Sequence, residues 1–448
     1  MSVACEIALS DVVQSLNARL LGDSVVFSGV TTDSRSDVRG RLFVALRGEK
    51  FDAHEFAGDV QANGAAALLV ERELPLSIPQ LVVKDTLAAL GQLASYWRSQ
   101  LSIPVIAVTG SNGKTTVKEM LAAIFSQNSE IVATKGNLNN HIGVPLTLLS
   151  IGKQHKAAII EMGANHPGEI AYLTRIAKPH VAIINNAGAA HLEGFGSLEN
   201  VAKAKGEIYQ GLDEQGVAVI NADDQFAPLW TRLTQHNKQL TFGIQNKADV
   251  SGQWQGDIQG NRINVNTPIG DFSCVMKLLG KHNVMNALAA TAVAVGAGVD
   301  LELIKSGLEL LQPVPGRMQI KPGKNGSRII NDTYNANPYS LRAGLEVLAA
   351  CDGEKYLVLG DMGELGEDVE KLHQQAGVDA RQAKVDKLFS LGNFSRFATT
   401  AFGKNAEHFD DVNRLIDAVS KSLSKDTTVL VKGSRSMRME RVVEGLQI

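Results

Sequence analysis

The stretch that decides the fold of this chain is Val105-Ile106-Ala107-Val108-Thr109-Gly110-Ser111-Asn112-Gly113-Lys114-Thr115-Thr116. An apolar, β-branched run of strand character leads into glycines and Lys-Thr-Thr, and a helical pattern follows over 117–125. This order suits a nucleoside triphosphate, because backbone N–H groups converge on phosphate oxygens at the positive end of a helix. Lys114 would reach the terminal phosphates, and the Thr115 hydroxyl would reach Mg²⁺. The glycine that usually stands five positions before Gly113 is Val108 here, so the motif has the shorter form G-x-x-G-K-T-T, and a chance glycine turn is the alternative.

Length and composition exclude several classes of protein. At 448 residues the chain is too long for one hydrophobic core, and 44% hydrophobic with 20% charged residues is typical of a soluble globular protein. A net charge of −3 gives no basic field for nucleic acid. Residues 1–10 do not resemble a signal peptide, and no apolar run approaches the roughly 20 residues that span a bilayer. Three separated cysteines indicate neither a zinc site nor a disulfide framework, so a cytoplasmic location is expected.

The sequence predicts an α/β fold with three domains, at 1–84, 85–312 and 313–448. The first has a helical pattern at 7–20 and strands at 41–45, 66–70 and 81–83. In the second, a helix at 85–100 precedes strands at 105–108, 157–161, 181–185 and 217–220, which alternate with helices and so predict a parallel sheet. Short antiparallel strands are expected over 251–275 and a helix over 281–296. Gln312-Pro313-Val314-Pro315-Gly316 reads as a linker, after which strands are expected at 328–332, 356–360, 387–391 and 428–433, with a last helix at 434–445.

Glu161 is the first candidate metal ligand. It ends the apolar run 157–160, and a carboxylate at the carboxyl end of a parallel strand lies where such folds bind ligands. Mg²⁺ prefers hard oxygen donors. A solvated carboxylate at a strand end is about as common in isolation, but the phosphate loop one strand earlier favours the metal ligand.

Two further candidates carry weaker signals. His191 follows the strand at 181–185 and a flexible turn, but a lone histidine is often a surface residue, and neither interpretation is favoured strongly by spacing. Lys205, on a predicted helix at 198–211, is on the residues alone an ordinary helical lysine.

Polar residues also gather after the linker. Asp332, Asn335 and Asn337 form a polar turn between a strand and a helix that begins with proline, which suits a nucleotide. Arg317 would supply a cation to a transferring phosphoryl group. Each is weak evidence alone.

One motif is a decoy. Residues 246–249, Asn-Lys-Ala-Asp, match the guanine-binding motif of GTPases, but a D-x-x-G must come between the phosphate loop and that motif. The candidates at 249–252 and 257–260 coincide with it or follow it. We therefore predict a surface turn and not a GTPase switch.

Together these residues resemble the Mur ligase family along nearly the whole chain. The phosphate loop at 109–116 has that family's short form, and 136–145, 161–163 and 280–283 also resemble its members. Thr32-Asp33-Ser34-Arg35, with 52–54 downstream, resembles the UDP-sugar domain of the tripeptide-stage members. The stretches 331–338, 360–366 and 431–435 most resemble the member that adds D-alanyl-D-alanine.

The resemblance implies an N-terminal UDP-sugar-binding domain, a central ATP-binding domain and a C-terminal Rossmann-like ligase domain. It also implies an ATP-dependent, Mg²⁺-requiring amide-bond ligase of peptidoglycan precursor synthesis. Such an enzyme joins D-alanyl-D-alanine to UDP-N-acetylmuramoyl-tripeptide through an acyl phosphate. A cytoplasmic monomer is expected.

The resemblance further assigns roles to residues, with Lys114, Glu161, His191, Lys205 and Arg317 as the catalytic set. Thr115 and Glu161 would hold one Mg²⁺, and His191 with Lys205, as its carbamate, a second; the role of Lys205 rests wholly on the resemblance. The phosphates would be bound by Gly110, Ser111, Asn112, Gly113, Lys114, Thr115 and Thr116. The rest of the nucleotide would be surrounded by His282, Asn283, Asn286, Arg317, Asp332, Asn335 and Asn337. The UDP end would be bound by Ser34 and Arg35, and the muramoyl peptide by Asn139, Asn140 and His141.

Three alternatives stay open at this point. Folylpolyglutamate synthase shares the ligase core, but the unit containing Asp33-Ser34-Arg35 argues against it. A sibling Mur ligase that adds one amino acid is the second. A nucleotide-binding switch without ligase activity is the third, and the presence of Glu161, His191 and Lys205 argues against it, because a switch needs no second metal.

Overall fold

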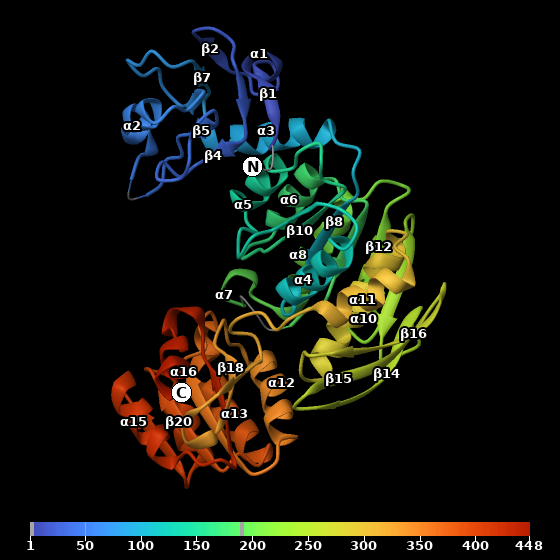
Figure 1. Ribbon diagram of the computed structural model, residues 1–448, viewed down its shortest axis with the longest axis vertical. Coiled ribbons are helices and arrows are strands. Elements are labelled where there is room, and N and C mark those ends of the chain that lie inside the picture. The colour runs from blue at the N-terminus through green and yellow to red at the C-terminus, as the bar shows by residue number, and fades with distance from the viewer. Residues whose placement is uncertain (1–3, 50, 189–191) are drawn as a thin grey trace.

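The computed structural model of the chain describes residues 4–49, 51–188 and 192–448. Within these residues the strands form four sheets, distributed over three bodies that follow one another along the chain (Figure 1). The α/β class and the three-part organisation predicted from the sequence are confirmed. No helix in the described part of the chain is long and apolar enough to cross a bilayer.

The first body contains a small sheet of β1 and β3 and a second sheet with the order β2-β7-β6-β5-β4. Its elements are β1 (Glu6–Ala8), α1 (Leu9–Val12), β2 (Arg19–Leu21), β3 (Val26–Ser28), β4 (Val30–Thr31), β5 (Leu42–Val44), η1 (Ala53–Phe56), α2 (Ala57–Ala62), β6 (Ala67–Val70) and β7 (Gln80–Val82). The long helix expected at 7–20 is wrong. Residues 6–8 pair with β3 instead, and the chain turns back at Asn17, whose φ is +48°, to begin β2. Ile7, Leu9, Val12 and Leu16 are nevertheless buried, so the apolar spacing marked the core and not a continuous helix.

Helix α3 (Thr86–Ser99) connects the first body to the second, and the Asp85 carboxylate caps it by accepting N–H groups from Leu87 and Ala88. Within the described residues, the second body has a nine-stranded sheet in the order β16-β15-β14-β13-β12-β11-β8-β10-β9. The strands are parallel from β9 to β14, and β14, β15 and β16 are antiparallel, as expected for 251–275.

The elements of the second body begin with β8 (Val105–Thr109), α4 (Lys114–Phe125), β9 (Ile131–Ala133), α5 (Gly143–Leu149), β10 (Ala157–Glu161), α6 (Glu169–Ala177) and β11 (Val181–Ile184). They continue with α7 (Leu192–Phe195), α8 (Leu198–Gly206), η2 (Glu207–Gly211), β12 (Val217–Asn221), α9 (Ala227–Leu233), β13 (Lys238–Gly243), β14 (Val250–Asp257), β15 (Gly260–Thr267), β16 (Gly270–Met276), α10 (Lys281–Gly296) and α11 (Leu301–Leu310).

Both faces of the central sheet are covered, which explains why its strands read as continuous apolar runs. Ile106 and Val108 of β8 pack into one cluster with side chains of α4 and α10. Val105 and Ala107 point to the opposite face, into a cluster with side chains of α3, α5 and α6. The carboxyl end of β8 is therefore held rigidly where the phosphate loop begins.

The third body has a six-stranded sheet, counted over the described residues, in the order β17-β18-β22-β19-β20-β21. Its elements are β17 (Gln319–Pro322), η3 (Lys324–Gly326), β18 (Arg328–Asp332), α12 (Pro338–Ala349), β19 (Glu354–Gly360), η4 (Gly366–Asp368), α13 (Val369–Gln382), β20 (Lys387–Leu391), α14 (Ser395–Phe402), β21 (Ala406–Phe409), α15 (Val412–Ser422), β22 (Thr427–Lys432), η5 (Arg435–Met437) and α16 (Glu440–Leu446). The single helix expected at 434–445 is divided, because Arg438 adopts a φ of +49° between η5 and α16. All pairs of this sheet are parallel except β17 with β18.

Candidate active site

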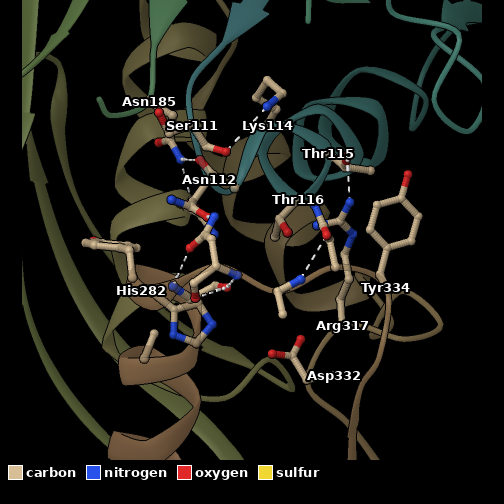
Figure 2. Close-up of a pocket in the computed structure, with 18 of the residues that line it drawn as sticks. Ser111, Asn112, Lys114, Thr115, Thr116, Asn185, His282, Arg317, Asp332 and Tyr334 are labelled. Atoms are coloured by element: carbon tan, nitrogen blue, oxygen red, sulfur yellow. Dashed lines mark hydrogen bonds between the residues drawn. The ribbon is translucent and has the colours of Figure 1, made fainter. Parts of the chain in front are cut away.

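A cavity of about 410 Å³ lies between the central body and the third body. The phosphate loop and the carboxyl end of β10 line it on one side, and the loops that follow β18, β19 and β22 line it on the other. Figure 2 shows side chains of the phosphate loop together with Arg317, Tyr334 and Asp332. The predicted site residues on its wall are Ser111, Asn112, Gly113, Lys114, Thr115, Thr116, Asn139, Glu161, His282, Asn283, Asn286, Arg317, Asp332, Asn335 and Asn337. Residues more than 200 positions apart in the sequence thus meet in one site.

The phosphate loop ends in a residue that must be glycine. Gly113 has a φ of +78°, and a Cβ there would lie 2.4 Å from Asn185 Nδ2 and 2.4 Å from Asn286 Oδ1. Lys114, the first residue of α4, donates from Nζ to the Gly110 carbonyl oxygen at 2.7 Å. Burial lowers the pKa of the Lys114 ammonium, and the negative charge of Glu161 opposes that shift.

A chain of asparagines fixes the loop from the side. Asn185 Nδ2 donates to the Asn112 carbonyl oxygen and to Asn286 Oδ1, both at 2.9 Å. Asn286 Nδ2 continues to Asn283 Oδ1 at 3.0 Å, and Asn112 N–H donates to Asn186 Oδ1 at 2.8 Å. Asn185 and Asn186 were not predicted as site residues. Their signal was the position directly after strand β11, which lies beside β8 in the sheet.

Glu161 is the strongest candidate metal ligand among the described residues. Its side chain is buried, and Oε1 accepts from Asn139 Nδ2 at 2.8 Å. Its Oε2 is buried and has no hydrogen-bond partner among the described residues. A buried carboxylate oxygen without a partner is costly unless a cation binds it. The donor set of Glu161 and the Thr115 hydroxyl on one cavity wall therefore fits a hard cation such as Mg²⁺.

The structure describes one of the two residues of the expected second metal site. His191 lies outside the described residues. Lys205, on α8, is only 2% exposed and is not among the described residues that line the cavity. Burial, and then the charge of Lys114, hold the pKa of the Lys205 ammonium well below its usual value.

Among the described residues, two side chains of the third body form hydrogen bonds with the phosphate loop. Arg317 Nη2 donates to Thr115 Oγ1 at 3.0 Å, and its guanidinium lies 4.1 Å from the centre of the Tyr334 ring (Figure 2). Asn337 Nδ2 donates to Asn112 Oδ1 at 2.9 Å. The predicted cation and the predicted polar turn are thus both in contact with the loop.

Lys432 was missed as a site residue, although the segment that contains it was part of the family resemblance. It is 1% exposed, lies at the carboxyl end of β22, contacts Asp332 Oδ2 and donates to the Asn335 carbonyl oxygen at 3.0 Å. Asp332 and Lys432 are register partners of β18 and β22, which no sequence spacing could reveal.

Burial lowers the pKa of His282 to about 4, so the imidazole is neutral at pH 7. The positive charge of Lys432 also lowers this pKa, whereas the negative charge of Asp332 opposes the shift.

Some predicted site residues are not among the described residues that line the cavity. Ser34 and Arg35 belong to the first body, where Arg35 Nε pairs with Asp33 Oδ1 at 2.9 Å. Asn140 and His141 precede α5 and are not among the described lining residues; Asn140 Oδ1 accepts the N–H of Gly143 at 2.9 Å.

The decoy motif at 246–249 is a mostly exposed turn, as predicted. The carboxylate of Asp223 accepts the backbone N–H groups of residues 244–246 at the start of this turn.

Comparison with known proteins identifies the family. The chain matches the Mur ligase middle domain over residues 108–294 and the Mur ligase, glutamate ligase domain over residues 316–435. It is 45% identical over 445 residues to the UDP-N-acetylmuramoyl-tripeptide–D-alanyl-D-alanine ligase of Escherichia coli (strain K12), with 98% of each chain covered. The chain belongs to the Mur ligase family.

Solved structures place this Mur ligase near members named MurF. A crystal structure of MurF from Acinetobacter baumannii superposes with a TM-score of 0.93 at 38% identity, covering 98% of each chain. MurF from Thermotoga maritima in complex with ADP has a TM-score of 0.83 at 30% identity, covering 93% of this chain and 96% of the other. The family resemblance found in the sequence is confirmed, and with it the dependence on ATP that Mur ligases share.

Proposed function

We propose that this Mur ligase joins D-alanyl-D-alanine to the tripeptide of UDP-N-acetylmuramoyl-tripeptide, with ATP as the energy source, in peptidoglycan precursor synthesis. The observation that carries the proposal is the cavity, which combines a phosphate loop on one wall with Arg317 and the polar turn after β18 on the other. Support also comes from the names of the relatives that match nearly the full length of the chain.

The chemistry follows from charge. A carboxylate is a poor electrophile, so the γ-phosphoryl group of ATP is first transferred to the terminal carboxylate of the tripeptide. Two anions must meet in this step, and Lys114 and Arg317 reduce their repulsion. The acyl phosphate is then attacked by the amine of D-alanyl-D-alanine, and phosphate leaves. The position of the cavity between two bodies would keep water from the intermediate.

Magnesium would be held by Thr115 and Glu161. When bound, it supplies positive charge that stabilises the transferring phosphoryl group. His191 and Lys205 would serve a second ion, with Lys205 as a carbamate. The lowered pKa of Lys205 supports this, because a neutral amine is the form that reacts with CO₂. The modification would replace a buried amine by anionic oxygen donors, which hard metals prefer.

The remaining site residues have the roles that the family resemblance implies. The nucleotide would lie among Asn112, His282, Asn283, Asn286, Asp332, Asn335 and Asn337. Ser34 and Arg35 would bind the UDP end, and Asn139, Asn140 and His141 the muramoyl peptide. The domains would span 1–84, 85–312 and 313–448, in a monomeric, cytoplasmic enzyme.

Phosphate release from Mg-ATP tests the proposal. Release that requires both UDP-N-acetylmuramoyl-tripeptide and D-alanyl-D-alanine, with a pentapeptide product, is the expected result. Phosphate release with single amino acids in place of the dipeptide would instead indicate a Mur ligase that adds one amino acid. Turnover of ATP that ignores both substrates would refute a ligase.

A further inference from the structure

The loop that follows β19 brings a carboxylate to the active-site cavity. Glu364 lines the same cavity as Lys114 and Arg317 and is itself exposed, so molecules that enter from solvent can reach it. Its φ is +61°, a left-handed conformation that is unfavourable for a side chain with a Cβ. Such strain persists where the surrounding structure enforces it, and it is frequent at ligand sites.

The residues just before Glu364 are anchored by hydrogen bonds. Met362 N–H donates to Nε2 of His373, a fully buried histidine of α13, at 3.0 Å. Gly363 N–H donates to Ser434 Oγ at 2.6 Å. The carboxylate of Asp361, three residues before Glu364, accepts backbone N–H groups at the start of α14, namely those of Asn393, Phe394 and Ser395. These hydrogen bonds fix the part of the loop that directly precedes Glu364.

The charge of Glu364 does not suit the anionic substrates. The cavity must accept the phosphates of ATP and the carboxylate of the tripeptide, and a glutamate on its wall repels both. Its charge is felt within the site, since it raises the pKa of Lys114 against the effect of burial. The acceptor brings a positive charge to the reaction, because an α-amino group with a pKa of roughly 8 is mostly an ammonium at pH 7.

We infer that Glu364 binds the ammonium group of the acceptor and receives its first proton; this rests on the proposed function. The proton passes from the ammonium to the carboxylate and then to solvent. The nitrogen lone pair attacks the carbonyl carbon of the acyl phosphate, and the C–N bond forms. The C–O bond to phosphate breaks, its electron pair leaves with the phosphate, and the second proton of the nitrogen goes to that phosphate.

Two reactions of the full-length enzyme test this assignment in the variant Glu364→Gln. The first is pentapeptide synthesis with varied D-alanyl-D-alanine at pH 7, where KM for the dipeptide should rise about 10- to 100-fold, as expected for a lost hydrogen bond between charged groups. The second replaces the dipeptide by hydroxylamine, which is largely neutral at pH 7 and traps the acyl phosphate as a hydroxamate. Hydroxamate formation should stay within about twofold of wild type, since the ATP and tripeptide sites are intact. The KM defect should shrink at pH 9, where the dipeptide amine is already neutral.

Two further variants keep the test decisive. Glu367→Gln removes an exposed carboxylate three residues away that is not among the described lining residues, and its kinetics should match wild type. Glu364→Gly removes the side chain and relieves the left-handed backbone, so it should fold and show the same rise in KM.

Three results would overturn the inference. One is an unchanged KM for D-alanyl-D-alanine in Glu364→Gln. Another is an equal loss of hydroxamate and pentapeptide, which would assign the carboxylate to ATP or its metal. A wild-type enzyme that forms neither product would overturn the proposed function, and the inference with it.

Discussion

The two walls of the cavity are built in different ways. The central wall is built around one contiguous segment, the turn between β8 and α4, whose geometry follows from local strand, turn and helix structure. Residues at the carboxyl ends of β10, β11 and β12 and on α10 surround this turn. The opposite wall is assembled from the linker and from loops that follow three separate strands of the third sheet. Two hydrogen bonds, Arg317 to Thr115 and Asn337 to Asn112, join this wall to the phosphate loop. Substitutions on the central wall should therefore abolish chemistry, whereas those on the opposite wall should weaken binding by smaller, substrate-specific amounts.

The largest effect is expected for Lys114→Met. The variant keeps an unbranched side chain but removes the cation that we propose to bind the phosphates, so kcat/KM for ATP should fall by about 10²- to 10³-fold. Phosphate release measures this loss, with circular dichroism as the check on folding. Lys153→Met, at an exposed position, is the control and should be unaffected. A loss below about tenfold would show that the loop backbone alone carries phosphate binding.

The next effect concerns Glu161→Gln. Its amide oxygen can still accept from Asn139, but the negative charge is lost, and we expect Mg²⁺ to be bound about 10- to 100-fold more weakly. The Tm should be unchanged or higher, because a buried charge with an oxygen that lacks a partner is removed. A Mg²⁺ titration of ATP turnover and a thermal melt measure the two quantities. Glu199→Gln, at an exposed site, is the control. An unchanged Mg²⁺ requirement would exclude Glu161 as a ligand.

What the sequence could predict depended on whether a feature is local, and this holds on both walls. The phosphate loop, Glu161 and helix α10 are local features, and their patterns located them within a residue or two. Asn185 and Lys432 were missed as site residues because their roles depend on which strands are neighbours, β11 beside β8 and β22 beside β18. The helix expected at 7–20 failed for a related reason, since pairing with β3 overrode a local pattern. Lateral contacts between strands distant in sequence are set by the packed fold.

A third prediction concerns how the free energy of unfolding depends on pH through His282, which lines the cavity. The pKa of His282 in the folded chain, about 4, lies below the ordinary value of 6.5, so the unfolded chain binds more protons between these values. The free energy of unfolding should therefore fall as pH decreases below about 6.5, by about 2 kcal/mol at pH 5 from this group. His282→Gln should lose that part of the pH dependence in denaturant titrations, whereas His236→Gln, at an exposed histidine, should keep it. Equal slopes for His282→Gln and wild type would contradict a lowered pKa of His282 in the folded chain.

The smallest effect is expected where the opposite wall meets the loop, in Asn337→Asp. Asn337 has two functions: its Oδ1 accepts the N–H of Ser340 and caps α12, and its Nδ2 donates to Asn112. Aspartate is an equally good cap, so the Tm should stay within about 2 °C, but it cannot donate to Asn112. One lost hydrogen bond corresponds to a rise of about 2- to 10-fold in KM for ATP.

A double-mutant cycle with Asn112→Ala separates the contact from other effects of the new charge. If the bond between the walls is what matters, the two substitutions together should cost less than the sum of each alone. Strict additivity would mean that the contact carries no energy in the working enzyme. A large fall in kcat for Asn337→Asp alone would mean that this wall takes part in the chemistry, and the division between the two walls would then have to be abandoned.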